Sequence, residues 1–410
     1  MTALARSPLR RLWALDPDVV FLNHGSFGAT PIAVLEEQQR WRDRMESDPV
    51  RFFVRDLDAA LAEVRRVLGN FVGADPDGLA LIPNATAGVN TIARSLRFAP
   101  GDEILATDHE YNASLNAVRF AAERDRARLV VVPLGYPVTG PDEVVTRVMD
   151  AVTPRTRLLL VSHVTSPTAI VLPVERLVPL LRARGIETLV DGAHAPGMLP
   201  QDLEVLGAAY YTGNCHKWMC APKGAAFLHV RSDLRDAIRP LSISHGANDP
   251  DTSRSRFRKE FDWTGTDDPS AFLAIPAAIE QVGGMLPGGW PQVMRANRDM
   301  AIQGREAVRA ALAGADLDPG PLAAPDAMTG SMATVPLPGR GRVPHDARSP
   351  LDPDPIGAAL WEGWRIEVPV LPIPGGGTGG GRLVRISAQL YDDPDEYALL
   401  GSALAELCAK

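Results

Sequence analysis

The chain has 410 residues, of which 45% are hydrophobic and 22% are charged, and its formal net charge is −8. This length exceeds one typical domain and predicts a large domain with a smaller one. No basic stripe and no apolar run of membrane-spanning length is visible, which argues against nucleic acid and membrane partners. Three cysteines without the Cys/His spacing of a zinc site argue against a metal and fit a reducing cytoplasm.

Short apolar runs alternate with amphipathic segments through the first 230 residues. The runs predict seven strands, at 79–82, 103–107, 128–132, 157–163, 187–190, 208–212 and 225–230. Helical stripes lie between several of them, at 86–97, 141–152 and 173–184. This order predicts an α/β fold with a mostly parallel seven-stranded sheet covered by helices, and ligands bind such sheets beyond the carboxyl ends of the strands.

The composition changes after about residue 285, and residues 313–356 are rich in Pro, Gly, Ala and Asp. Further strands are predicted at 330–335, 361–368 and 382–387. We interpret 21–284 as the large domain and 285–410 as a smaller α+β C-terminal domain. Residues 1–20 are expected to pack on the small domain.

A lysine and an acid lie at the predicted ends of two strands. Lys217 stands in Gly213-Asn-Cys-His-Lys-Trp218, and Asp191 ends the run that precedes it. Both can point into one cleft, as pyridoxal phosphate (PLP) chemistry requires. The lysine forms a Schiff base with the aldehyde, and the acid keeps the pyridine nitrogen protonated.

The segment Asn84-Ala85-Thr86 follows a strand and opens a helix, where free N–H groups suit a phosphate, although a simple helix cap explains it equally. His109 or Tyr111, after the next strand, could stack on a cofactor ring, and the alternative is a polar loop. Thr165 follows a third strand at the same edge.

Other candidates have structural alternatives. His194 could hold the Asp191 carboxylate or a cofactor ring oxygen, and His216 could bind a phosphate oxygen or be a buried core histidine. Arg385, in the middle of a predicted strand, is either an ion-pair member or a clamp for an amino-acid carboxylate. The glycines of 375–381 lack the strand-then-helix context of a dinucleotide site and predict a mobile loop.

Six stretches in order resemble the class V aminotransferase family of fold type I PLP enzymes, and most resemble its isopenicillin N epimerase-like members. They are Phe21-Leu-Asn-His-Gly-Ser-Phe-Gly28, Asn84-Ala-Thr86, Asp108-His-Glu-Tyr-Asn112, Ser162-His-Val-Thr-Ser-Pro167, Val190-Asp-Gly-Ala-His-Ala-Pro-Gly197 and Gly213-Asn-Cys-His-Lys-Trp218. The likeness covers roughly 15–280 well and the remainder thinly. It implies PLP as cofactor and a homodimer with shared sites.

The resemblance assigns roles to particular residues. Lys217 would carry the Schiff base and Asp191 would face the pyridinium nitrogen, with His194 near the ring oxygen. The cofactor would further be held by Ala85, Thr86, His109, Thr165, Asn214 and His216, and by Thr266 of the neighbouring subunit. Asn23, His24 and Arg385 would bind substrate, and Tyr111 is the candidate second proton carrier. Desulfurases of this class use a cysteine on the loop at 375–381, which this chain lacks, and have asparagine where this chain has Ser166.

The resemblance leaves three functions open. The first is an amino-acid epimerase in which the substrate amine displaces Lys217 and the freed lysine removes the α-proton. The second is a transaminase or β-lyase acting on an unknown amino acid. The third, which the intact Lys217 and Asp191 disfavour, is a catalytically silent binding protein.

Overall fold

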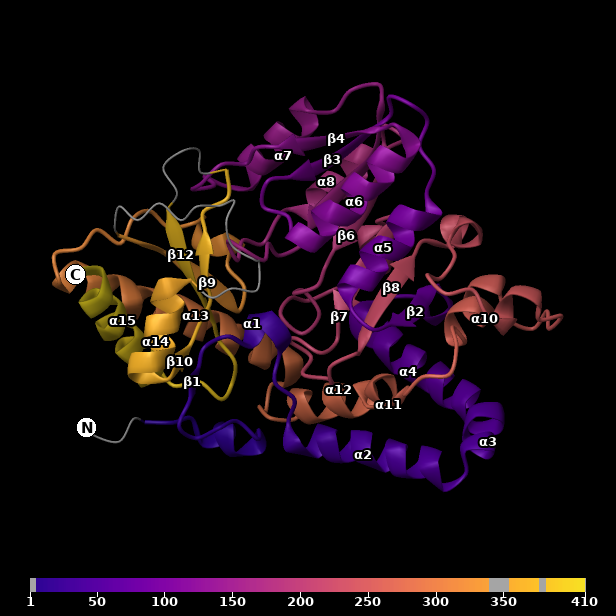
Figure 1. The fold of residues 1–410 in the computed structure, drawn as a ribbon, viewed down its shortest axis with the longest axis horizontal. Coiled ribbons are helices and arrows are strands. Elements are labelled where there is room, and N and C mark those ends of the chain that lie inside the picture. The colour runs from indigo at the N-terminus through magenta and orange to yellow at the C-terminus, as the bar shows by residue number, and fades with distance from the viewer. Residues whose placement is uncertain (1–4, 339–353, 376–380, 410) are drawn as a thin grey trace.

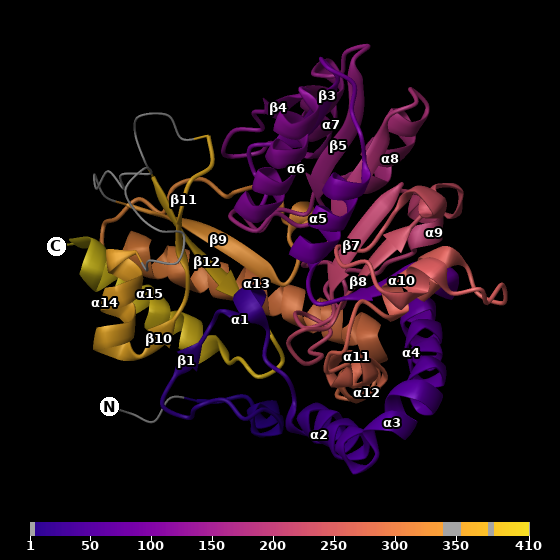
Figure 2. The ribbon, with the colours of Figure 1, turned by 45° about the vertical axis from the view of Figure 1, so that its right-hand side comes forward.

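The computed structural model describes residues 5–338, 354–375 and 381–409. Its centre is a seven-stranded sheet in the order β2-β8-β7-β6-β5-β3-β4 (Figures 1 and 2). The strands are β2 (Leu79–Ile82), β3 (Glu103–Thr107), β4 (Arg128–Val132), β5 (Thr156–Ser162), β6 (Glu187–Asp191), β7 (Tyr210–Asn214) and β8 (Ala226–Val230). All neighbours pair in parallel except β8, which is antiparallel to β2 and β7. The predicted α/β fold with a mostly parallel seven-stranded sheet is confirmed.

Alternate residues of each strand enter two separate apolar clusters, one on each face of the sheet. In β5, for example, Leu158 and Leu160 join one cluster, while Leu159 and Val161 join the other. The first face is covered by α5 (Ala85–Ser95), α6 (Asn112–Asp125) and α10 (Arg256–Asp262). The second is covered chiefly by α4 (Leu57–Val72), α7 (Pro141–Asp150), α8 (Val174–Arg182), α11 (Ser270–Leu273) and α12 (Ile275–Gly283). Burial on both faces explains why these strands read as continuous apolar runs.

Shorter elements and one long helix complete this part of the chain. They are η1 (Pro8–Leu12), α1 (His24–Phe27), α2 (Ile32–Ser47), α3 (Pro49–Arg51), η2 (Phe52–Asp56), η3 (Pro76–Gly78), α9 (Leu203–Leu206), η4 (Ser232–Ala237) and η5 (His245–Asn248).

A third apolar cluster forms around a three-stranded antiparallel sheet in the order β11-β12-β9. Its elements are α13 (Gly289–Gly314), η6 (Asp326–Met328), β9 (Met332–Leu337), α14 (Pro355–Trp364), β10 (Ile366–Glu367), β11 (Val370–Pro372), β12 (Arg382–Ser387) and α15 (Pro394–Ala409). The chain start joins this region, because β1 (Val20–Phe21) pairs with β10 and the Ser7 hydroxyl donates to Leu390 O at 2.7 Å. The division at 20 and 285 remains our interpretation.

One predicted strand, at 361–368, is wrong. The helix α14 continues through Trp364, Arg365 caps it in the left-handed region at φ 56°, and only Ile366–Glu367 is extended. The sequence signals for this helix lie upstream, where Asp354 caps Ile356 N and Pro355 fits the first turn. Residues 339–353 and 376–380, which include most of the predicted glycine loop, lie outside the described residues.

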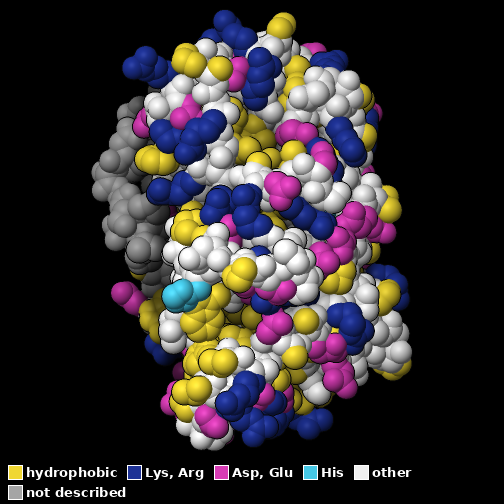
Figure 3. Space-filling model, turned by 90° about the vertical axis from the view of Figure 1, so that its right-hand side faces the viewer, with side chains coloured by type: hydrophobic (Ala, Val, Ile, Leu, Met, Phe, Trp, Pro, Cys, Tyr) yellow, Lys and Arg dark blue, Asp and Glu magenta, His cyan; other side chains and the backbone are white. Residues whose placement is uncertain are grey.

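Among the described residues, no helix is both long and apolar enough to cross a membrane, and no group of three or more His, Cys, Asp or Glu side chains could hold a metal ion. On the face drawn in Figure 3, Lys and Arg side chains alternate with Asp and Glu instead of forming one basic surface.

Candidate active site

Lys217 and Asp191 meet at the carboxyl edge of the large sheet. Asp191 ends β6, its neighbour on β7 is Thr212, and Lys217 lies three residues beyond the end of β7 at Asn214. Burial and the nearby Arg385 guanidinium lower the pKa of Lys217 to about 7, while Asp191 opposes that shift. An amine with this pKa is substantially unprotonated near neutral pH, as a nucleophile or base must be.

His194 holds the lysine amine. Its Nε2 lies 3.1 Å from Lys217 Nζ, and its Nδ1 accepts from the indole N–H of Trp218 at 3.4 Å. Burial, followed by the charge of Lys217, holds the pKa of His194 well below its ordinary value. His194 is therefore neutral and lies beside the lysine, and its predicted place near the cofactor ring oxygen stays a prediction.

Asp191 is buried and its carboxylate is held in place. Oδ2 accepts from the Ser114 hydroxyl at 2.7 Å, and Oδ1 accepts from Ala193 N at 3.1 Å. These bonds fix the orientation of the carboxylate. Ser114, on α6, was not anticipated, because a serine in the middle of a helix carries no distinctive signal.

A second buried acid, Glu110, was also missed. It accepts hydrogen bonds from the Thr107 hydroxyl, at 2.7 Å, and from the Ser162 hydroxyl. Burial raises the pKa of Glu110 to about 8, and the nearby Asp191 adds to the shift. Glu110 is therefore mostly protonated near pH 7. The sequence signal was available, since Glu110 stands inside the Asp108–Asn112 motif.

The turn before α5 offers a phosphate site. Asn84 Oδ1 accepts from Ala87 N and Asn214 Oδ1 accepts from Ala85 N, each at 2.8 Å. The backbone N–H of Ala85, a predicted phosphate ligand, is thus already bonded within the protein. In the part of the chain that the structure describes, Thr86 N and the Asn214 amide nitrogen keep no partner and remain available to an anion.

His216 lies beside this turn. Its Nδ1 donates to Ala225 O at 2.9 Å, which leaves Nε2 for a ligand, and burial lowers its pKa to about 4. A phosphate would therefore have to stabilise a proton on Nε2 for His216 to donate to it.

The structure separates the two candidates for ring stacking. His109 is 0% exposed, and its ring nitrogens bond to Thr168 Oγ1 and Gly135 O at 2.8 Å each. Tyr111 is 47% exposed and lies close enough to Arg385 to influence that residue's pKa. Tyr111 presents the more accessible ring, and stacking by His109 or by Tyr111 stays a prediction.

Thr165 is likewise not accessible. Its hydroxyl bonds to Thr168 Oγ1 at 2.7 Å and accepts from Ile170 N at 2.8 Å, and the side chain is 0% exposed. Its hydrogen bonds shape the turn after β5, and its contact with the cofactor stays a prediction.

Arg385 is a buried guanidinium with neutral partners. It lies on β12 and donates to Ser166 O at 2.6 Å, to Ser166 Oγ at 3.2 Å and to Ser26 Oγ at 3.0 Å. Its Nε has no partner, and no described carboxylate pairs with it. Asn23 Oδ1 accepts from the Ser26 hydroxyl at 2.6 Å, so Asn23 is linked to Arg385 through Ser26. A buried cation left without an anion favours binding of a substrate carboxylate over the ion-pair alternative.

His24 has a different place from the predicted one. Its Nε2 lies 2.9 Å from Lys217 O and its Nδ1 lies 2.8 Å from Tyr391 Oη, so both ring nitrogens are bonded within the protein. These contacts hold the loop that carries Lys217, and the substrate contact of His24 stays a prediction. Gly28 packs on the same loop at φ 71°, where a Cβ atom would lie 1.9 Å from His216 O.

Thr266 lies in the exposed segment after α10, where the described chain offers its side chain no hydrogen bond. Its neighbours Thr264, Gly265 and Asp267 line a cavity together with Pro83 and Ala87 at the start of α5.

These residues fit PLP. A lysine amine of lowered pKa lies beside a held carboxylate, an anion site lies at the start of α5, and an orphaned buried guanidinium lies opposite. When bound, the cofactor would be held by Lys217, Asp191, His194 and the turn before α5.

Comparison with known proteins agrees with this chemistry. The family model described as aminotransferase class-V matches residues 22–285. Isopenicillin N epimerase from Amycolatopsis lactamdurans is 36% identical over 99% of this chain and 100% of its own length. A probable chloroplastic L-cysteine desulfhydrase from Arabidopsis thaliana is 30% identical over 95% of this chain and 83% of its length.

A solved structure of the cystine C–S lyase C-DES in complex with cysteine persulfide superposes with a TM-score of 0.75 at 22% identity, covering 95% of this chain and 98% of that one. This likeness concerns the fold alone. The family match and the two relatives show that the chain belongs to the class V aminotransferase family, whose members are PLP-dependent enzymes of fold type I.

Proposed function

We propose that this enzyme inverts the configuration of an amino-acid substrate at its α-carbon. The observation that carries the proposal is the buried, carboxylate-free guanidinium of Arg385, which lies near the Lys217 amine of lowered pKa. A substrate carboxylate bound by Arg385 would present its α-carbon to that amine. The identity of 34–36% to two isopenicillin N epimerases supports inversion as the outcome.

The residues divide the work between binding and proton transfer. PLP, when bound, holds the amino acid covalently and withdraws electrons from the α-carbon. Lys217 then takes the α-proton at Nζ, with His194 orienting the amine. Asp191, fixed by Ser114, supplies the negative charge that faces the cofactor nitrogen. Arg385 binds the carboxylate and holds the substrate in register.

Inversion also needs a proton donor other than Lys217. Tyr111 is our candidate because its phenol is half-exposed and lies close enough to Arg385 to influence the pKa of that guanidinium. The phenol hydroxyl would deliver a proton to the α-carbon on the face that Lys217 does not reach.

Elimination at the β-carbon is the second candidate. It is favoured by the 30% identity to L-cysteine desulfhydrases and needs no second proton carrier. Desulfuration through a protein thiol is disfavoured, because Cys215 and Cys220 are fully buried and burial raises the pKa of each. Transamination stays a third outcome, and a silent binding protein is disfavoured by the intact Lys217–Asp191 pair.

Isotope exchange separates these outcomes. The PLP-loaded enzyme is incubated in deuterated water with a panel of single-configuration amino acids, and products are analysed by chiral chromatography and mass spectrometry. Inversion predicts deuterium at the α-carbon of both configurations without release of keto acid. Keto acid with sulfide or thiol would establish elimination, and conversion of the cofactor to its amine form would establish transamination. Absence of exchange, of keto acid and of the amine form of the cofactor with every substrate would contradict all three.

The Tyr111→Phe variant tests the second proton carrier. We expect inversion to fall by about 10²–10⁴-fold, the usual contribution of a positioned acid or base. Exchange of the α-proton with retained configuration should persist, because Lys217 is intact. Equal loss of exchange and inversion would show that Tyr111 acts in binding instead.

We further propose a homodimer in which Thr266 of one subunit reaches the phosphate site of the other. Support comes from the exposure of residues 264–268 and from a cavity of about 270 Å³ between this segment and α5, bordered by exposed Leu241. Light scattering would give the mass. Mixing Lys217→Ala with Thr266→Ala subunits should regain activity only if sites are shared. A cytoplasmic location, suggested by three free cysteines, also stays a proposal.

A further inference from the structure

Trp218 contacts both histidines that hold the catalytic lysine. Its side chain is 0% exposed, its indole N–H donates to His194 Nδ1 at 3.4 Å, and its ring lies 4.9 Å from that of His24. The other nitrogen of His194 lies 3.1 Å from Lys217 Nζ. Two consecutive residues of one loop therefore bond to the two nitrogens of the same imidazole.

The bond from Trp218 decides where His194 carries its proton. An indole nitrogen can only donate, so His194 Nδ1 must offer its lone pair. Burial keeps His194 neutral, with a pKa well below the ordinary value. A neutral imidazole has one proton, which must then lie on Nε2, the nitrogen that faces the lysine.

This tautomer determines which protonation state of Lys217 can form a hydrogen bond with His194. An Nε2–H group donates to Nζ only if the amine has a lone pair, whereas an ammonium would present a second donor. The other charged groups around the amine are Arg385 on β12, which disfavours the ammonium, and Asp191 on β6, which favours it. The hydrogen bond from His194 therefore disfavours the protonated lysine, as the charge of Arg385 does.

We propose that Trp218 is a positioning residue that fixes His194 in the Nε2–H tautomer, so that His194 donates to the Lys217 amine and keeps it unprotonated. With PLP bound, the same proton would point toward the cofactor. This inference concerns Lys217 in any reaction of the family and does not depend on inversion.

The tautomer can be observed directly in the full-length chain. Nitrogen NMR of the protein labelled at histidine distinguishes protonated from unprotonated ring nitrogens, and His194→Gln identifies the signals of His194. We expect an unprotonated Nδ1 and a protonated Nε2 in the wild type, and a mixture of both tautomers in Trp218→Phe. A proton on Nδ1 in the wild type, or an unchanged tautomer in the variant, would contradict the proposal.

The second readout is recapture of the cofactor. The rate at which the cofactor-depleted chain forms its covalent bond with added PLP follows the unprotonated fraction of Lys217. We expect its pH inflection to lie near 7 in the wild type and to rise by about one unit in Trp218→Phe, slowing recapture at pH 7 about fivefold. An inflection that does not move would overturn the proposal.

A matched control separates the lost N–H from the lost volume. Trp290 on α13 donates its indole N–H to Ile279 O at 2.9 Å, outside the site. Trp290→Phe should leave both readouts unchanged, and an equal change there would contradict the proposal. If Trp218→Phe does not fold, benzothienylalanine at position 218 keeps the bicyclic shape without the N–H and must give the same shifts.

Discussion

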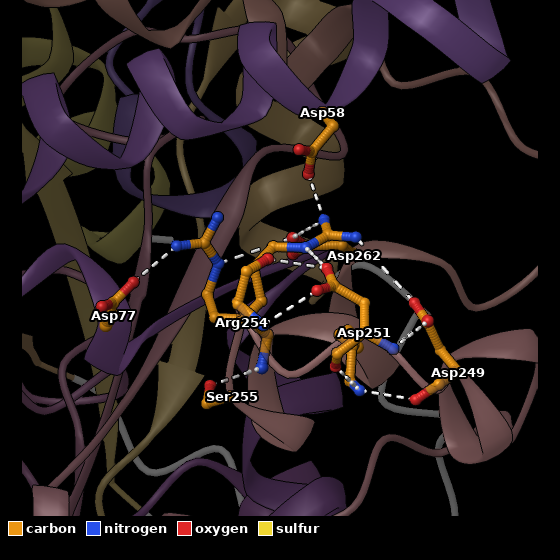
Figure 4. Close-up of polar contacts among 10 residues, drawn as sticks. Asp58, Asp77, Asp249, Asp251, Arg254, Ser255 and Asp262 are labelled. Atoms are coloured by element: carbon orange, nitrogen blue, oxygen red, sulfur yellow. Dashed lines mark hydrogen bonds and ion pairs between the residues drawn. The ribbon is translucent and has the colours of Figure 1, made fainter.

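Arg385 and Arg254 are two arginines with opposite surroundings. Arg385 is 3% exposed, donates only to neutral oxygens and leaves Nε without a partner. The Arg254 side chain is 30% exposed and lies among four carboxylates, as Figure 4 shows, those of Asp58, Asp249, Asp251 and Asp262. The charge of Arg385 has no carboxylate partner among the described residues, whereas the charge of Arg254 has four.

The difference indicates where ligand chemistry takes place. A buried charge without a counter-ion costs free energy, so a fold retains it where a ligand supplies the missing charge. Partly exposed pairs stabilise weakly, because water screens them and the side chains lose freedom on pairing. The site around Lys217 belongs to the first kind, and the carboxylates around Arg254 belong to the second.

Removal of the catalytic amine should give the largest effect. Lys217→Ala should lower turnover by about 10²–10⁴-fold or more, because it deletes both the base and the covalent attachment. Borohydride should trap cofactor on the wild-type protein and not on the variant, as mass spectrometry would reveal. Continued trapping in Lys217→Ala would contradict the assignment of the lysine.

Loss of the unpaired guanidinium should be next in size. Arg385→Gln removes one charge-assisted bond to the substrate, worth about 1.5–3 kcal/mol, and should raise KM roughly ten- to a hundred-fold. Arg305 is the matched control, since it is also buried but pairs with Glu306 and Asp326. Arg305→Gln should lower stability and leave KM unchanged. Equal KM values in the two variants would remove the distinction drawn here.

The sequence predicted the sheet and the catalytic pair because both depend on local patterns. Buried parallel strands are continuous apolar runs, and Asp191 and Lys217 follow such runs directly. The roles of His109, Thr165 and His24 could not be read in this way. Each depends on a contact between distant segments, such as Thr168 with His109 or Tyr391 with His24, that decides whether a side chain faces the cleft or the core.

The missed residues have the same cause. Ser114 contacts Asp191 from the middle of a helix that carries no distinctive signal, and Trp218 ends the Gly213–Trp218 motif but contacts His194, which lies 24 residues earlier in the chain. The wrong strand at 361–368 arose differently, because an apolar run of that length fits a helix end as well as a strand.

The pH dependence of stability should reveal the burial of His24, which contacts the loop that carries Lys217. Burial lowers the pKa of His24 to about 3, whereas an unfolded histidine titrates near 6.5. Below pH 6.5 His24 is protonated in the unfolded chain but stays neutral in the folded protein. The contribution of His24 to the free energy of unfolding is therefore full above pH 6.5 and is lost as the pH falls toward 3. Between pH 6.5 and 5 the loss from His24 is about 2 kcal/mol.

Urea unfolding at pH 7 and pH 5 measures this loss. His24→Gln keeps an N–H that can donate to Lys217 O and should reduce the stability loss between pH 7 and pH 5 by about 2 kcal/mol, while buried His194 and His216 account for part of the remainder. The control His245→Gln changes an exposed histidine and should leave the dependence as it is in the wild type. A variant at His24 with an unaltered slope would mean that other groups account for acid sensitivity.

The smallest effect is expected at Arg254. Because Arg254 and three of its four carboxylate partners are partly exposed, Arg254→Ala should lower the free energy of unfolding by about 1 kcal/mol or less, and added salt should reduce the difference between variant and wild type. Turnover and KM should be unchanged, since none of its partners lies at the Lys217 site. A KM change comparable with that of Arg385→Gln would show that a fully paired arginine also affects substrate binding. An unpaired buried charge would then not be a reliable sign of the substrate site.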